Sequence, residues 1–181
     1  MAKEFLLDIK EIRRRARANM EEGSVTEGYK TDKNRVIAVL NEALATEIVC
    51  TLRYRRHYYM AQGIHSKAVA DEFQEHAEDE QEHALRIAER ITQLGGAPDF
   101  NPEGLTSRSH AEYVEGDSLT SMLKEDLVAE RIAIQSYSEI IRWLGDQDPT
   151  SRRLLESILE KEEEHAKDLV DLLAGMKPIT Y

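Results

Sequence analysis

The chain has 181 residues and a formal net charge of −11 at pH 7. This length suffices for one domain with a well-buried core, and the negative charge argues against the whole chain being a general nucleic-acid binder. A single cysteine, Cys50, excludes an intrachain disulfide framework and any metal site that needs several thiolates, which favours a cytoplasmic location. Only four Pro and nine Gly are present and no alternating strand-like run is evident, so the chain is predicted to be all-α.

An amino-terminal arm and linker are predicted over residues 1–33. A short helix over residues 3–20 should lead into a segment, 23–34, that lacks apolar periodicity. The apolar and basic sides of the arm consist of Phe5, Leu6, Ile9 and Ile12 and of Arg13, Arg14, Arg15 and Arg17. Charged residues interrupt the first twelve positions, so neither a signal-peptide core nor a membrane span is predicted.

Four long helices are predicted to form a bundle over residues 34–175, followed by a short tail, 176–181. They should run from about Arg35 to Gln62, from Ser66 to Leu94, from Asp117 or Ser118 to Leu144, and from Asp148-Pro149 to near Gly175. Residues 97–116 contain two prolines and no sustained period, which indicates a long connection between the second and third helices. That length allows a crossover along the bundle.

Two copies of the pattern Glu-x-x-His lie where these helices should be apolar. Glu80 and His83 fall within one apolar series, and Glu162 and His165 fall within another, each pair one helical turn apart on one face. The two series are Val69, Phe73, His76, Ile87 and Leu94, and Leu155, Ile158, Leu169 and Leu172. The acids and imidazoles are therefore predicted to point into the core.

Each of the other two long helices carries one acid in its apolar series, Glu47 in the first and Glu130 in the third. The lone acid precedes the Glu-x-x-His pattern by 33 residues in the first half (47 to 80) and by 32 in the second (130 to 162). A tyrosine follows each acid by seven residues, at Tyr54 and Tyr137. The repeated spacing predicts a site with pseudo-twofold symmetry.

Four acids converging in one core predict a metal site. An unpaired buried carboxylate costs several kcal/mol, and two divalent cations neutralise four carboxylates. Mixed oxygen and imidazole donors suit iron or manganese, and a paired site can pass two electrons to dioxygen or peroxide. The predicted ligands are Glu47, Glu80, His83, Glu130, Glu162 and His165.

Other interpretations of single residues stay open. One Glu-x-x-His alone is more often a solvated helix face, and only the doubled pattern favours metal. His76, one turn before Glu80, is more often a hydrogen-bonded rim residue than a further ligand. Tyr54 suits either a role beside the metals or an ordinary core position, and Cys50 is most simply a small apolar core residue.

These residues resemble the ferritin-like superfamily, and within it the bacterioferritins and the Dps-like mini-ferritins, over Val36 to Leu173. The most specific parts are Leu40 to Glu47, Asp79 to Ala84 and Glu162 to His165. The resemblance implies a ferritin-like four-helix bundle with a long crossover between helices two and three. It also implies that the six predicted ligands form a ferroxidase centre with two iron ions, supported by Tyr54 and Asp126.

Two departures from the bacterioferritin pattern affect what the resemblance implies. Gln81 stands where bacterioferritins have the methionine that binds haem, which argues against haem. Only residues 176–181 follow Gly175, where ferritins continue into a fifth short helix, and this favours a cage of twelve subunits over twenty-four. Mini-ferritins of the common type build their centre between subunits, whereas this chain holds all six predicted ligands itself.

The function predicted from the sequence is iron storage and detoxification. The enzyme would be a ferroxidase that oxidises Fe²⁺ with O₂ or H₂O₂ at an intra-subunit diiron site and mineralises Fe³⁺ inside a homo-oligomeric cage. One alternative is a rubrerythrin-like diiron peroxidase or oxidase without storage, which the lack of a four-cysteine module disfavours. Another is a Dps-like DNA-protecting protein, suggested by the arginines of the arm. Packing of the arm against a neighbouring subunit is favoured over contact with DNA.

Overall fold

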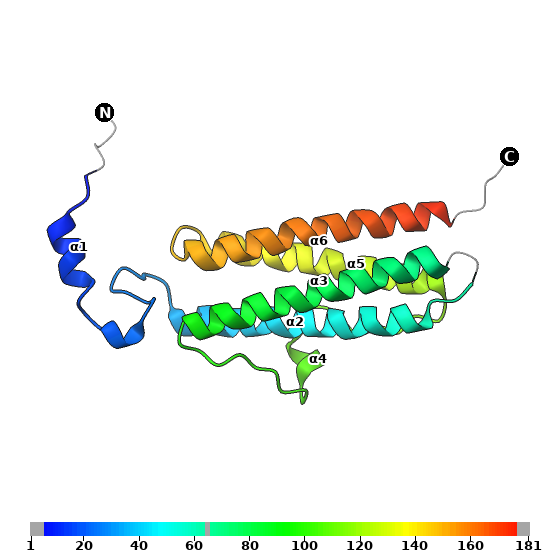
Figure 1. Cartoon of the computed structure of the whole chain (residues 1–181), viewed down its shortest axis with the longest axis horizontal. Coiled ribbons are helices and arrows are strands. Elements are labelled where there is room, and N and C mark those ends of the chain that lie inside the picture. The colour runs from blue at the N-terminus through cyan, green and yellow to red at the C-terminus, as the bar shows by residue number, and fades with distance from the viewer. Residues whose placement is uncertain (1–5, 64–65, 177–181) are drawn as a thin grey trace.

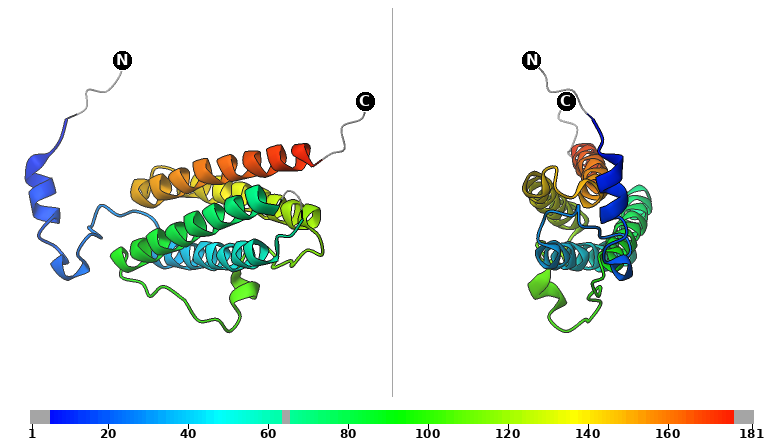
Figure 2. Two further views of the ribbon diagram at one scale, coloured as in Figure 1. Left: turned by 45° about the vertical axis from the view of Figure 1, so that its right-hand side comes forward. Right: turned by 90° about the vertical axis from the view of Figure 1, so that its left-hand side faces the viewer.

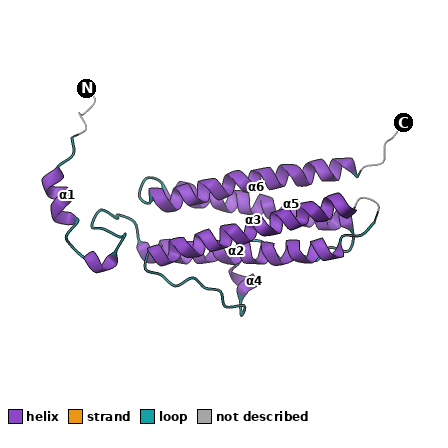
Figure 3. Cartoon of the chain, in the orientation of Figure 1, coloured by secondary structure: helices purple, strands orange, loops and turns teal. Residues whose placement is uncertain are grey.

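The structure, a computed structural model, describes residues 6–63 and 66–176. Regular secondary structure in these residues consists entirely of helices (Figure 3), which confirms the all-α prediction. The helices are α1 (Ile9–Arg15), a 3₁₀ turn (Met20–Glu22), α2 (Lys33–Met60), α3 (Ser66–Gln93), α4 (Leu105–Arg108), α5 (Leu119–Leu144) and α6 (Pro149–Gly175). None of the described helices combines the length and the apolar character that a membrane span requires.

Helices α2, α3, α5 and α6 form the bundle (Figure 1), and its end-on view shows the four side by side (Figure 2). α2 pairs with α3, α5 pairs with α6, and the connection between the pairs runs outside the bundle. The predicted crossover is thus present. The connection contains one short helix that was not predicted, α4, which follows Gly104 in the left-handed conformation (φ 71°) and packs against α2.

Side-chain caps set the starts of three long helices. Asp32 accepts hydrogen bonds from the backbone of Asn34 and Arg35, so α2 begins at Lys33, two residues before the predicted start. Ser118 caps α5 as predicted, in a reciprocal pair with Ser121. The predicted cap at Asp148 and proline at the first position of α6 are also present.

The amino-terminal arm is less helical than predicted. The helix expected over residues 3–20 is only α1, because Asp8 caps its start by accepting from the Glu11 backbone and the left-handed Asn19 (φ 51°) leads into the 3₁₀ turn. Helix α1 buries none of its residues and stands apart from the bundle (Figure 1). Phe5 of the arm and residues 177–181 of the predicted tail lie outside the described residues.

The linker after the arm packs onto one end of the bundle. Val25 is buried in the main apolar cluster, and the Tyr29 hydroxyl donates to Asp148 Oδ2 over 2.8 Å. The same carboxylate caps α6 and accepts from Arg90 of α3 over 3.0 Å. A segment that has no periodicity in the sequence therefore has defined contacts with two helices of the bundle.

Two apolar clusters fill opposite halves of the bundle. One contains Val36, Leu40, Leu44, Ile87, Ile91, Leu144, Leu155 and Ile158. The other contains Tyr54, Val69, Phe73, Met122, Leu123 and Leu169. Apolar packing thus holds the bundle together on both sides of its midpoint, where the predicted ligands lie. The burial of these apolar side chains supplies most of the stability of such a fold.

A buried polar network joins the long connection to the bundle. Arg53 of α2 donates from Nε to Asp126 of α5 over 2.7 Å and from Nη1 to the Glu112 carbonyl over 2.9 Å. His57 lies between the other oxygen of Asp126 (2.8 Å) and the Glu115 carbonyl (2.9 Å). Arg53, His57 and Asp126 are all within 1% of complete burial, so removing one partner would leave a buried charge uncompensated.

We expect Asp126→Ala to lower the free energy of unfolding by about 3–5 kcal/mol, because Arg53 would stay buried without its counter-charge. Glu115→Ala is the matched control, since it removes the acid of an exposed pair with Arg56, and such pairs contribute about 1 kcal/mol or less. Urea denaturation at one protein concentration measures both. Equal losses in the two variants would contradict the structural role given to Asp126.

Candidate metal centre

The structure brings all six predicted ligands together at the middle of the bundle. Each long helix contributes from near its own midpoint: α2 gives Glu47, α3 gives Glu80 and His83, α5 gives Glu130, and α6 gives Glu162 and His165. Each of the six is no more than 4% exposed. The helical period places these side chains inward because it places the flanking apolar residues inward.

The six side chains form two overlapping groups. The ligand atoms of Glu47, Glu80, His83 and Glu162 lie within 4.8 Å of one another, and so do those of Glu80, Glu130, Glu162 and His165. Two residues, Glu80 and Glu162, belong to both groups. The arrangement can therefore hold two cations, each with one glutamate and one histidine of its own and both joined by the two shared carboxylates.

Both histidines turn Nδ1 toward the centre. His83 Nδ1 lies 3.2 Å from Glu47 Oε2 and 3.1 Å from Glu162 Oε1. His165 Nδ1 lies 3.4 Å from Glu80 Oε1, while its other nitrogen, Nε2, lies 3.1 Å from Asp79 Oδ2. A carboxylate behind an imidazole fixes the orientation and tautomer of a metal ligand. Asp79 has this position behind His165. In the sequence, the only indication of this role was that Asp79 directly precedes the predicted ligand Glu80.

The two tyrosines cross the centre to the opposite acid. The Tyr54 hydroxyl of α2 donates to Glu130 of α5, and the Tyr137 hydroxyl of α5 donates to Glu47 of α2. Burial raises the pKa of both phenols, so they remain donors. The repeated seven-residue spacing thus corresponds to a reciprocal pair of hydrogen bonds. In the sequence, the only indication of a role for Tyr137 was that it follows Glu130 at the same spacing at which Tyr54 follows Glu47.

The buried carboxylates of the cluster disfavour charge on one another and favour it on the imidazole of His165. Burial and the Glu162 carboxylate raise the pKa of Glu80 to about 7, and burial and the Glu80 carboxylate raise the pKa of Glu130. Burial alone would raise the pKa of Glu162, but the imidazoles of His165 and His83 hold it below its ordinary value. Burial opposes a charge on His165, yet Asp79 and Glu162 raise its pKa to about 12. Positive charge is therefore favoured at this point of the core.

Four buried polar atoms of the cluster make no hydrogen bond with the described residues, because the nearby imidazole nitrogens approach them without the alignment of a hydrogen bond. They are Glu80 Oε1, both carboxylate oxygens of Glu162, and His165 Nδ1. Buried polar groups are nearly always satisfied, and these four belong to the group around the shared carboxylates. Oxygen and imidazole donors left without protein partners fit a pair of divalent cations, and iron is suited to this donor set.

Asp126, implied by the resemblance to support the centre, has its hydrogen bonds in the network with Arg53 and His57. The link to the centre is indirect, because the Arg53 guanidinium also lies 5.8 Å from the ring centroid of Tyr54. The roles of Arg53 and His57 were not predicted. Their one signal is a four-residue spacing on the helix face next to Tyr54.

His76 is buried rather than at a rim, contrary to the simpler interpretation of the sequence. Its ring stacks on that of His165 with 3.9 Å between centroids, and its Nδ1 lies 3.1 Å from the Tyr54 hydroxyl. Burial and the neighbouring His165 lower the pKa of His76 to about 3, so the ring is neutral. His76 thus adjoins the centre from the side of the second apolar cluster.

The chain is similar to several known proteins, both in sequence and in structure. The family model described as the ferritin-like domain matches residues 37–179. The bacterioferritin of Desulfovibrio desulfuricans is 32% identical over 134 residues, 74% of this chain and 71% of the relative. A solved structure of that organism's bacterioferritin, which describes a diiron site, has a TM-score of 0.71 and 30% identity over 81% of this chain and 82% of its own.

Two further relatives have names that describe different properties, a dodecameric assembly in one and DNA binding in the other. The bacterioferritin-related protein of Bacteroides fragilis, described as a dodecameric thioferritin, superposes with a TM-score of 0.78 and 34% identity over 81% of this chain and 89% of its own. A nutrient stress-induced DNA-binding protein of Synechococcus is 31% identical over 141 residues, 75% of this chain and 78% of the relative.

We expect the double variant Glu47→Gln/Glu130→Gln to raise the free energy of unfolding of the metal-free protein by about 1–4 kcal/mol, because it removes two buried like charges. Each glutamine keeps a carbonyl oxygen for the tyrosine that donates to it. The control is Glu78→Gln/Glu139→Gln on exposed faces. Thermal unfolding after chelation measures the effect, and a loss of stability in the first variant would refute it.

Proposed function

The chain belongs to the ferritin-like family, and on this premise we propose that it oxidises Fe²⁺ to Fe³⁺ and stores the product inside a closed assembly of identical subunits. The observation that carries the proposal is the pair of overlapping ligand groups that share Glu80 and Glu162. Iron storage agrees with the bacterioferritin relatives, and the geometry of the centre supports the finer assignment of a ferroxidase.

In this proposal each residue of the centre has one role toward the iron substrate. Glu80 and Glu162 bridge two Fe²⁺ ions. Glu47 and His83 complete one position, and Glu130 and His165 complete the other. The tyrosine hydroxyls hold the two terminal carboxylates in place, and Asp79 holds His165. All ligands come from one chain, so each subunit has its own centre.

The reaction follows from having two one-electron donors side by side. Two Fe²⁺ ions together release two electrons and become two Fe³⁺ ions. With two protons these electrons reduce O₂ to H₂O₂, or reduce H₂O₂ to two water molecules. Taking electrons in pairs avoids one-electron oxygen radicals, and the Fe³⁺ product leaves for a mineral inside the assembly.

Two alternatives have weaker support. A rubrerythrin-like peroxidase would need an electron-transfer module, whereas the sequence has one cysteine, Cys50, and it is buried. A DNA-protecting role is suggested by the name of the Synechococcus relative and by the arginines of the arm. Within the arm, however, Arg14 pairs with Glu11 and Glu27, and Arg17 donates to a backbone carbonyl. These contacts reduce the number of guanidinium N–H groups that the arm has available to bind DNA phosphates.

The assembly proposed here has twelve subunits. Its support is the Bacteroides relative described as dodecameric, which is 34% identical to this chain over 89% of its own length. The arm is proposed to pack on a neighbouring subunit, because its apolar side chains remain exposed when the chain is alone. These are Leu6, Leu7, Ile9, Ile12 and Met20. Arginine also suits an acidic neighbour, since the chain carries a net charge of −11.

The ferroxidase assignment predicts that the protein binds two Fe²⁺ per chain anaerobically and oxidises them in a fast phase when O₂ or H₂O₂ is added. Glu80→Ala and Glu162→Ala should each abolish the fast phase, because each removes a bridging ligand. Glu82→Ala and Glu163→Ala are matched controls on exposed faces of the same helices. Stopped-flow absorbance follows Fe³⁺ formation, and wild-type rates in both bridging variants would exclude this centre.

Deletion of residues 1–22 should reduce or weaken the assembly, measured by light scattering, while leaving iron oxidation per chain nearly unchanged. The reason is that the exposed apolar side of the arm is removed but no proposed ligand lies there. A gel shift with DNA at two salt concentrations tests the alternative, in which the arm binds DNA. An unaltered assembly together with loss of a salt-sensitive shift would make the arm a nucleic-acid tether.

A further inference from the structure

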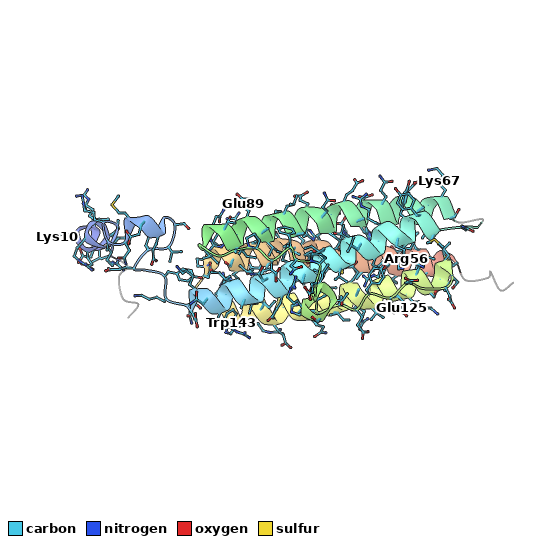
Figure 4. The ribbon with its side chains drawn as sticks, turned by 90° about the horizontal axis from the view of Figure 1, so that it is seen from below. Lys10, Arg56, Lys67, Glu89, Glu125 and Trp143 are labelled. Carbon is cyan, nitrogen blue, oxygen red and sulfur yellow. The ribbon has the colours of Figure 1, made fainter. Side chains whose placement is uncertain are left out.

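A groove of about 330 Å³ lies between α2 and α5, near the start of α2. Its apolar lining includes Val39, Ile140 and Trp143, and Trp143 is the one tryptophan of the chain. This side chain is 46% exposed and lies at the end of the bundle nearest the arm (Figure 4). A large aromatic ring exposed beside an apolar groove is typical of a surface that binds another protein segment.

The polar lining of the groove favours a cationic segment. It includes two carboxylates, those of Glu42 and Glu139, and one guanidinium, that of Arg35. His110 also lines the groove, but its Nε2 lies 3.8 Å from Glu42 Oε2, which is too far for a hydrogen bond. The Glu42 side chain is 45% exposed and can accept from another cation. Arginine suits this position because its guanidinium binds a carboxylate and also stacks on an aromatic ring.

One side of α1 has the features that match the groove. Ile9, Ile12 and Arg13 lie on this side, since helical residues three and four apart are neighbours. The two isoleucines are 47% and 38% exposed. Arg14, on another side of α1, is paired with Glu11 over 2.8 Å, whereas Arg13 is exposed and has no ion pair among the described residues. This side of α1 thus presents two apolar side chains and a guanidinium to a partner.

The arm leaves the bundle on the side opposite to the groove. Ser24 donates over 2.6 Å to the carbonyl of the last residue of α3, and the contact between Tyr29 and Asp148 holds the linker at the start of α6. Arg14 lies 3.1 Å from Glu27, which keeps α1 beside this linker. In the end-on view α1 lies over the side of α3 and α6, away from α2 and α5 (Figure 2). The arm is therefore placed to reach another chain rather than its own groove.

We propose that the groove between α2 and α5 binds the apolar side of α1 from a second copy of this chain. Ile9 and Ile12 pack against Trp143, and Arg13 faces Glu42. Each chain has one arm and one groove, so a closed assembly uses every arm and fills every groove. Docking of this kind rests on the proposed assembly and is independent of iron oxidation.

The first test uses Trp143 as the probe, because a buried tryptophan emits further to the blue and is quenched less by acrylamide than an exposed one. Ile9→Ser/Ile12→Ser and Arg13→Glu should each shift the emission of the full-length assembly to the red and increase its quenching. Lys10→Glu is the matched control, since it reverses the same charge on α1 outside the apolar side and should keep the wild-type emission. These substitutions lie outside the bundle, so they leave the fold around the groove intact.

A charge exchange tests the individual contact. Glu42→Arg should repeat the red shift of Arg13→Glu, because each variant places two like charges together. The double variant Arg13→Glu/Glu42→Arg should restore the blue emission. Arm variants that shift the emission while the double variant stays as red as Arg13→Glu alone would contradict the pairing of Arg13 with Glu42.

A mixed assembly tests whether the arm comes from a second copy. Chains with Trp143→Phe and an intact arm are co-expressed with chains that keep Trp143 and carry Ile9→Ser/Ile12→Ser, and two different tags select assemblies that contain both. Tryptophan emission then comes only from chains whose own arm is defective. We expect it to shift toward the blue, since arms of the Trp143→Phe chains fill these grooves.

Three results would overturn the docking. They are an emission that the arm variants leave unchanged, a mixed assembly whose emission stays as red as that of Ile9→Ser/Ile12→Ser alone, and a failure of the two tagged chains to purify together. Failure of the proposed function has different signatures. A monomer in light scattering would remove the assembly itself, whereas a wild-type protein without fast Fe²⁺ oxidation would remove the ferroxidase and leave the Trp143 results unchanged.

Discussion

The burial of four carboxylates at the midpoint of one bundle is the constraint on which the rest of the structure depends. Charge of one sign cannot be concentrated in an apolar core without compensation. The compensation here comes in layers: histidine nitrogens and tyrosine hydroxyls next to the acids, then Asp79 behind His165 and Arg53 beside Tyr54. The apolar clusters on either side hold the four helices in register while the acids repel one another.

The bundle and the six central residues were predictable because periodicity is a local property. Glu47 and Glu162 stand out in sequence, since each interrupts an apolar series with a period near 3.6. The caps at Ser118 and Asp148 were predictable for the same reason: the side chain acts on a backbone within three residues. What these predictions share is that the interaction and its signal occupy one short stretch of chain.

Contacts that join distant stretches could not be predicted in this way. Tyr29 meets Asp148 across 119 residues, and Arg53 meets Asp126 across 73. The arm helix was predicted to be too long because propensity alone does not show that α1 starts only after the cap at Asp8 and ends at Arg15, before the left-handed Asn19. α4 follows Gly104 in a stretch that has no period, so its single turn gave no pattern to detect. Packing between elements decides these features, and a single sequence does not encode packing as a visible period.

The contact between Tyr29 and Asp148 ties the linker after the arm to the start of α6, the helix that carries Glu162 and His165. Asp148 holds the first turn of α6 and receives the Tyr29 hydroxyl at the same carboxylate. If the arm packs on a neighbouring subunit as proposed, a displacement of the arm would be transmitted through the linker to the start of α6. A rigid helix transmits a displacement along its axis, so tension on the arm would shift both residues together relative to α2 and α3. With the proposed assembly and the proposed metal centre, the affinity for metal would therefore depend on assembly, and assembly on metal to the same degree.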